Sequence, residues 1–145
     1  MHPAVRVFRS DSVAIASDVQ TPIPFEAARF DGPGLPMFDP LLPTRLTAQV
    51  PGRYQISGAI IWEEDPAGSF RNVGIRVNGT TYVALLSDPP IANADAGQAI
   101  STFFELAAGD YVELVVEQNS GGPLLIVKTT PPFDAASPEF MMVKI

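Results

Sequence analysis

The carboxylates at Glu63, Glu64 and Asp65 are the densest group of residues in this chain that could perform acid–base chemistry. A glycoside hydrolase needs two carboxyl groups facing one substrate, one as acid and one as base or nucleophile. Adjacent residues of a strand point to opposite faces, however, and Pro66 follows at once. We therefore interpret the run as a solvated loop, and a carboxylate-dependent glycan hydrolase remains an alternative.

The same run could supply oxygen ligands for calcium, a hard cation that prefers carboxylates and carbonyls. Asp88, Asp95 and Asp134 lie in other turn segments and could add to the set. The spacing does not follow that of an EF-hand loop. Calcium at Glu63, Glu64 and Asp65 is accordingly the one cofactor that the sequence leaves open.

Other catalytic chemistry has no residues to carry it. His2 is the only histidine and the chain has no cysteine, so a Ser-His-Asp triad or a thiolate metal site has no anchor. GxSxG, GxGxxG, HExxH and phosphate-loop motifs are absent from the sequence. We predict a protein that is not an enzyme.

Three aromatic residues near expected strand ends, Trp62, Phe70 and Tyr82, are candidates for ligand binding. An aromatic ring beside a loop can stack on a sugar or on a protein partner. Packing in the core or between subunits also explains them, and we favour packing. They stay candidate ligand residues.

The length and net charge of the chain limit its number of domains and the classes of partner that it could bind. The 145 residues suit a single domain over residues 1–145. The net charge of −7 and the dispersed Arg and Lys residues argue against nucleic acid, which is bound mainly through basic side chains. No segment has the 18 or so apolar residues of a membrane helix. The first twenty residues also lack a signal-peptide pattern, so we expect no membrane insertion and no export signal.

Prolines and glycines recur too often for ordinary helices, and the pattern between them predicts an all-β chain. Turn signals separate about ten strand-like segments. The pair Asn78-Gly79 is the strongest hairpin signal, and we expect Gly58 to mark a local bend. The expected strands are 4–9, 19–26, 45–50, 53–63, 70–77, 81–87, 98–106, 111–118, 124–129 and 139–145.

Several strands have apolar residues on both faces. In 111–118 the alternation puts Val112 with the core, and Tyr111 and Val115 on the opposite face. In the last strand Met141 and Val143 face away from the core side. A two-layer sandwich covers only one face of each strand, so a subunit interface is expected to cover the other.

Several segments together give a family resemblance over nearly the whole chain: Pro24-Phe25 with Ala28 to Asp31, Arg45 to Ala48, Val50 to Tyr54, Arg76 to Thr80, Leu106 to Val112, and Ser137 to Phe140. The chain resembles the C1q/TNF-like jelly-roll family, particularly its bacterial and phage versions. The resemblance implies a ten-stranded, two-sheet jelly-roll β-sandwich that forms homotrimers. It places Tyr111, Val115, Met141 and Val143 at the trimer interface.

From these features we predict a non-catalytic homotrimeric structural or binding module. We expect it on the surface of a phage virion, as a capsid decoration or tail-associated protein. Its partners would be its own copies, and another virion protein or a host-surface glycan or protein. The alternative is an extracellular bacterial adhesin domain that binds carbohydrate or protein.

Overall fold

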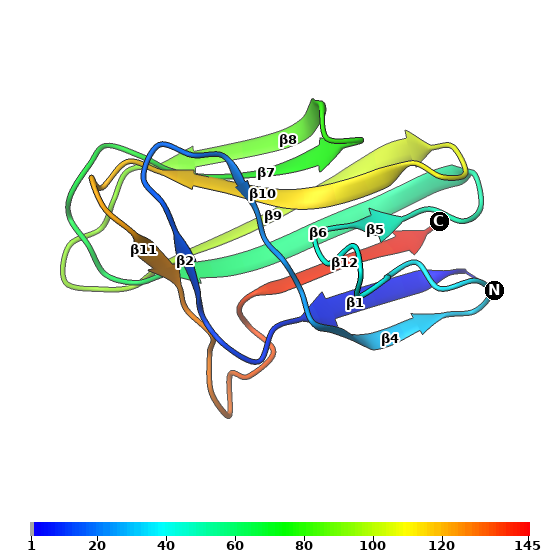
Figure 1. Cartoon of the computed structure of the whole chain (residues 1–145), viewed down its shortest axis with the longest axis horizontal. Coiled ribbons are helices and arrows are strands. Elements are labelled where there is room, and N and C mark those ends of the chain that lie inside the picture. Colours follow the sequence, from blue (N-terminus) through cyan, green and yellow to red (C-terminus); the bar gives the residue numbers. More distant parts are fainter. Residues whose placement is uncertain (1) are drawn as a thin grey trace.

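A computed structural model describes residues 2–145 of the chain as a two-layer β-sandwich (Figure 1). The described residues form two antiparallel sheets and no helix, and so contain no helix able to cross a membrane. The twelve strands are β1 (Ala4–Phe8), β2 (Val13–Ile15), β3 (Thr21–Pro22), β4 (Ala27–Gly32), β5 (Leu46–Thr47), β6 (Gly52–Trp62), β7 (Arg71–Val77), β8 (Thr81–Asp88), β9 (Ala96–Leu106), β10 (Tyr111–Gln118), β11 (Leu124–Ile126) and β12 (Glu139–Lys144).

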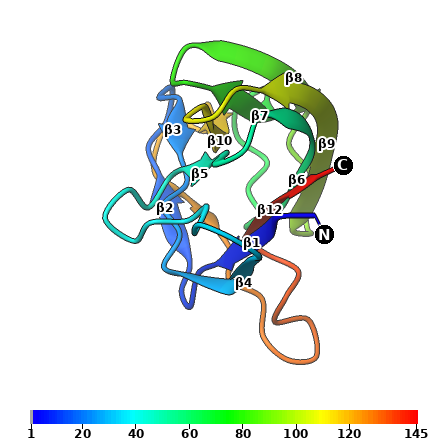
Figure 2. The ribbon, with the colours of Figure 1, turned by 90° about the vertical axis from the view of Figure 1, so that its right-hand side faces the viewer.

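The larger, seven-stranded sheet is built around β6. Strand β9 pairs with β6 along one edge, while β12 and β11 follow each other along its other edge. Strand β12 continues to β1 and then β4, and β11 pairs with β2. The long β6–β9 pair therefore forms the free side of this sheet, with β9 at its edge (Figure 2).

The smaller, five-stranded sheet has the order β3-β10-β7-β8, and β5 also pairs with β10. Its central strand β10 has the bounds that the sequence predicts. The hairpin between β7 and β8 turns at Asn78 and Gly79, which both have positive φ, 54° and 71°. Two successive positive φ values define the expected type I′ turn, because its geometry matches the twist of the strands.

The core lies between the sheets and is apolar. Alternate residues of each long strand point inward, as period-two patterning requires. Val112, Leu114 and Val116 of β10 are all fully buried, as predicted. Other strands of both sheets contribute further large buried side chains, among them Tyr54, Ile56, Ile60, Trp62, Val73, Ile75, Phe140 and Met142.

The strand list differs from the sequence prediction mainly in the first third of the chain, and the strand predicted over 124–129 ends at Ile126. The segment 19–26, expected to be one strand, pairs only at Thr21–Pro22. Pro22 and Pro24 have no backbone N–H group to donate, so a longer ladder cannot form there. Strands β2 and β4 were not predicted, because β2 is only three residues long and β4 is a mixed-polarity edge strand.

Gly58 corrects a second expectation. It pairs in regular register with Phe140 on one side and Ile100 on the other, with no bulge. A Cβ atom on Gly58 would lie 2.6 Å from Cδ1 of Leu114, which belongs to the opposite sheet. The glycine therefore serves the close packing of the two sheets.

Candidate assembly surface

The outer face of the seven-stranded sheet carries a continuous uncharged patch along β9, β6 and β12. Along these three strands, the side chains that point into the sandwich are mostly buried, and those that point outward are half-buried or exposed. A shallow groove of about 340 Å³ runs between Ala59, Ala99 and Met141. The uncharged patch consists of Ser57, Ala59, Ile61, Gly97, Ala99, Ser101, Phe103, Met141 and Val143.

Phe103 is the largest exposed group of the patch, at 65% relative exposure. It stands opposite Gln55 of β6, where the patch begins to give way to the charged residues Arg53 and Glu105. Small side chains over the rest of the patch leave the backbone of the sheet close to the surface. Such a flat, uncharged face allows another sheet to approach closely.

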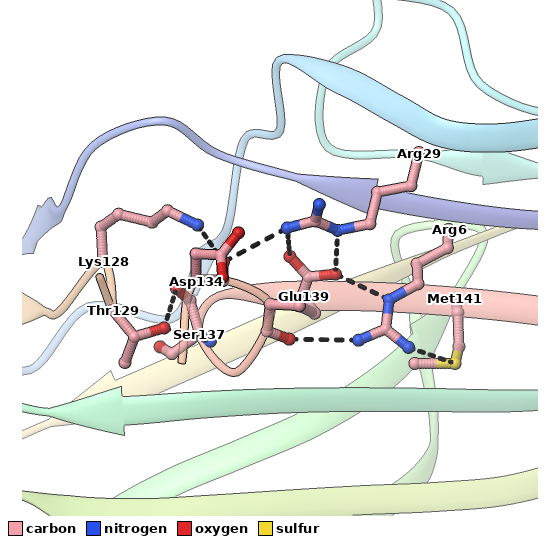
Figure 3. Close-up of polar contacts among 9 residues, drawn as sticks. Arg6, Arg29, Lys128, Thr129, Asp134, Ser137, Glu139 and Met141 are labelled. Atoms are coloured by element: carbon pink, nitrogen blue, oxygen red, sulfur yellow. Dashed lines mark hydrogen bonds and ion pairs between the residues drawn. The ribbon is translucent and has the colours of Figure 1, made fainter. Parts of the chain in front are cut away.

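A buried ionic cluster closes the side of the patch next to β1 and β4. The carboxylate of Glu139 on β12 is completely buried, between the guanidinium groups of Arg6 on β1 and Arg29 on β4 (Figure 3). Arg29 contacts both carboxylate oxygens, at 2.8 and 3.0 Å, and Arg6 Nε lies 2.7 Å from Oε1. The hydrogen bond to Glu139 raises the pKa of the Arg29 guanidinium further.

This cluster also fixes the segment between β11 and β12, which projects from the sandwich (Figures 1 and 2). Arg6 Nη2 donates to the carbonyl of Ala135 at 3.1 Å, and Arg29 Nη2 to that of Asp134 at 3.2 Å. The hydroxyl of Ser137 donates to the carbonyl of Val127 at 2.8 Å. The segment is thus held at the margin of the uncharged patch, beside Ile61.

The four residues predicted for a trimer interface fall on two different outer faces. Met141 and Val143 belong to the uncharged patch. Tyr111 and Val115 lie on the five-stranded sheet, where Arg45 stacks on the Tyr111 ring at 4.0 Å. Val115 is only 3% exposed in a single chain, so other residues of the same chain already cover it on the outer face of β10.

Glu113 also lies on the outer face of β10, and it is buried. Its carboxylate accepts a hydrogen bond from the Thr44 hydroxyl at 2.5 Å and pairs with Arg76 at 3.1 Å. The chain therefore satisfies this carboxylate by itself, without a neighbouring subunit.

The three aromatic candidates do not share a surface. Trp62 is fully buried, and its indole Nε1 donates to Gln98 Oε1 at 2.8 Å, so its ring cannot meet a ligand. Phe70 is half-buried near the loop that Asn119 holds. Tyr82 is 36% exposed on the outer face of the five-stranded sheet and lines a pocket there.

The acidic run does not converge on one point. Glu63 Oε1 accepts from the backbone N–H of Leu125 at 2.8 Å, while Glu64 Oε1 accepts from that of Asn93 at 3.0 Å. Asp65 Oδ1 accepts from the N–H of Ala67 within its own turn. Each carboxylate orders a different piece of backbone, and residues 2–145 contain no group of three possible metal ligands.

No protein-family model matches the sequence, and no curated protein matches it. Solved structures do match it. Murine APRIL at pH 8.0 aligns over 100% of both chains, with a TM-score of 0.70 and 13% identity. The chain has a C1q/TNF-like jelly-roll fold.

Two further similar structures are a C1q domain and a TNF domain. The globular domain of zebrafish complement 1qA aligns over 97% of this chain and 93% of its own, with a TM-score of 0.61 and 15% identity. Eiger TNF from S. frugiperda aligns over 100% of this chain and 92% of its own, with a TM-score of 0.65 and 12% identity. At these identities the likeness establishes the fold.

Proposed function

We propose that this protein is a non-catalytic homotrimeric structural and binding module whose copies meet through the uncharged patch. The observation that carries the proposal is the patch itself, a contiguous set of small and apolar side chains on β9, β6 and β12 with Phe103 exposed at its end. The number three follows from the C1q/TNF-like resemblance. Met141 and Val143 are the interface residues that remain in the proposal.

The charges around the patch support this use of the face. The carboxylate of Glu139 is fully buried and paired with both Arg6 and Arg29, so no unpaired carboxylate lies beside the patch. A stable interface buries about 800 Å² on each partner, with charged residues depleted at its centre. The native mass of the protein tests the proposal, because a monomer contradicts it.

We further propose that the trimer is a surface component of a phage particle, as capsid decoration or tail-associated protein. The resemblance to bacterial and phage versions of the fold supports this role. The net charge of −7 suits a partner other than the packaged nucleic acid. Co-sedimentation with intact particles in a density gradient tests it, and recovery with the host cell surface instead would favour an adhesin.

A further inference from the structure

A pocket on the outer face of the five-stranded sheet lies apart from the uncharged patch. It has a volume of about 240 Å³ and is lined by residues of β8, β7, β10 and the segment before β3. Since a water molecule occupies about 30 Å³ in the liquid, this space would admit one small ring-sized group. A single chain forms the pocket, so what it binds is independent of the oligomeric state.

Asn72 supplies the first sign that the pocket has a ligand. It lies directly opposite Glu117 across the β7–β10 pair, and both line the pocket. The amide oxygen of Asn72 is buried and accepts no hydrogen bond from residues 2–145. An unsatisfied buried acceptor costs stability, and asparagine is a poor strand residue, so the folded chain gains nothing from keeping it there.

Tyr82 supplies the second sign. A Cβ on Gly74 would lie 2.8 Å from Cδ1 of Tyr82, so the glycine lets the ring rest against the strand. The phenol hydroxyl donates to Gln20 Oε1 at 2.8 Å, which ties the ring across the sheet. Burial raises the pKa of this phenol, so it stays protonated as a donor at neutral pH. The result is an aromatic ring fixed in position and still exposed at the pocket.

The polar groups around the ring define the chemistry of the occupant. Glu117 offers acceptor oxygens, the amide nitrogen of Gln20 offers donors, and the amide of Asn72 lies in the pocket wall. Arg76 already lies 5.9 Å from the centre of the Tyr82 ring, and its charge disfavours a second cation there. A neutral ligand with several hydroxyl groups and an apolar ring face matches donors, acceptors and aromatic surface together.

We propose that this pocket is a saccharide-binding site that holds one sugar ring against Tyr82, with one hydroxyl group hydrogen-bonded to the Asn72 amide and another donating to Glu117. Leu85 and Val115 supply the apolar part of the wall. The site gives the module a binding function of its own, on the sheet opposite to the proposed assembly surface.

Saturation-transfer NMR tests this site with methyl glycosides of glucose, galactose, mannose, fucose and N-acetylglucosamine at millimolar concentration, and with Nα-acetyl-lysine amide as a cationic probe. We expect at least one glycoside to bind, and its signal to be lost in Asn72→Leu and in Glu117→Leu, which removes the acceptor oxygens. The matched control is Glu105→Leu, which alters an exposed carboxylate of β9 and should leave the signal unchanged.

The thermal midpoint of Asn72→Leu separates a ligand group from a structural one. Because the amide oxygen has no partner, we expect the variant to keep or raise the midpoint while it loses binding. A clearly lowered midpoint would make Asn72 structural and overturn the proposal. So would binding of no glycoside, binding of the lysine probe alone, or glycoside binding that survives both substitutions. The native mass, measured separately, reports on the assembly proposal alone.

Discussion

Arg29 holds both carboxylate oxygens of Glu139, with Nε 2.8 Å from Oε1 and Nη2 3.0 Å from Oε2. The pair joins the edge strand β4 to β12 across the intervening β1, and Arg6 of β1 completes it. A parallel two-point contact of this kind fixes geometry as well as charge. The pair therefore sets the position of β4 and of the 127–138 segment beside the uncharged patch.

We expect Glu139→Gln to lower the free energy of unfolding by about 1–3 kcal/mol, because it leaves two partly buried guanidinium groups without their counter-ion. Arg29→Met should cost more than Arg6→Met, since Arg29 makes the two-point contact. Urea denaturation at fixed protein concentration measures all three. Glu105→Gln is the control, and a loss in Glu139→Gln no larger than in this control would show that the cluster is not structural.

Gly58→Ala should destabilise the chain by about 1–3 kcal/mol through overpacking, because its new Cβ would meet the buried δ-carbons of Leu114 at 2.6 and 2.9 Å. Gly122→Ala is the matched control, since a Cβ there meets nothing within 4 Å. Trimming the neighbour in a Gly58→Ala, Leu114→Ala double variant should cost less than the sum of the two single changes. Thermal and urea unfolding of the four proteins measure this, and strict additivity would argue against the contact.

Asp110 links the turn before β10 to the β7–β8 hairpin and gives a pH prediction. The Asn78 side chain and the Ala107 backbone N–H donate to its carboxylate and hold its pKa below the usual range. A lowered folded pKa contributes stability above the unfolded value of about 3.9, and this stability is lost as the pH falls through the folded pKa. The stability difference between wild type and Asp110→Asn should be constant near neutral pH and shrink below about pH 4. A difference that grows on acidification would contradict this assignment.

The sequence predicts the fold where strands are long and flanked by strong turns. Strand β10 was predicted over its observed bounds, because strict alternation runs from Tyr111 to the turn after Gln118. The segment 19–26, predicted as one strand, pairs only at Thr21–Pro22, because its prolines have no backbone N–H to donate to a longer ladder. In β12 the structure places Met141 and Val143 on an outer face, and their part in an interface stays a prediction.

The candidate sites were harder to predict, because they depend on contacts between distant strands. Val115 looks exposed in the alternation of β10, but it is buried beside Tyr82, whose ring crosses the sheet over Gly74. Glu139 looks like a solvent-facing residue, yet its partners are more than a hundred residues away in sequence. The orphaned amide oxygen of Asn72 has no sequence signal apart from asparagine in the middle of a strand.

A charge in the uncharged patch should prevent self-association. Ser101→Arg puts a guanidinium at the centre of the patch, whereas Ser87→Arg puts one on β8 of the other sheet. Desolvating an unpaired charge at an interface costs several kcal/mol, so Ser101→Arg should shift the protein to monomer and Ser87→Arg should not. Sedimentation velocity of both variants measures the shift, and equal effects would place the interface elsewhere.

The most direct test of the assembly surface is the native mass of the unmodified protein, measured by native mass spectrometry and by light scattering over a range of concentrations. One chain has a mass of 15.5 kDa. We expect a single species of three times this mass, which dissociates in Ser101→Arg. A mass of one chain at all concentrations would contradict the proposed trimer and the role assigned to the uncharged patch.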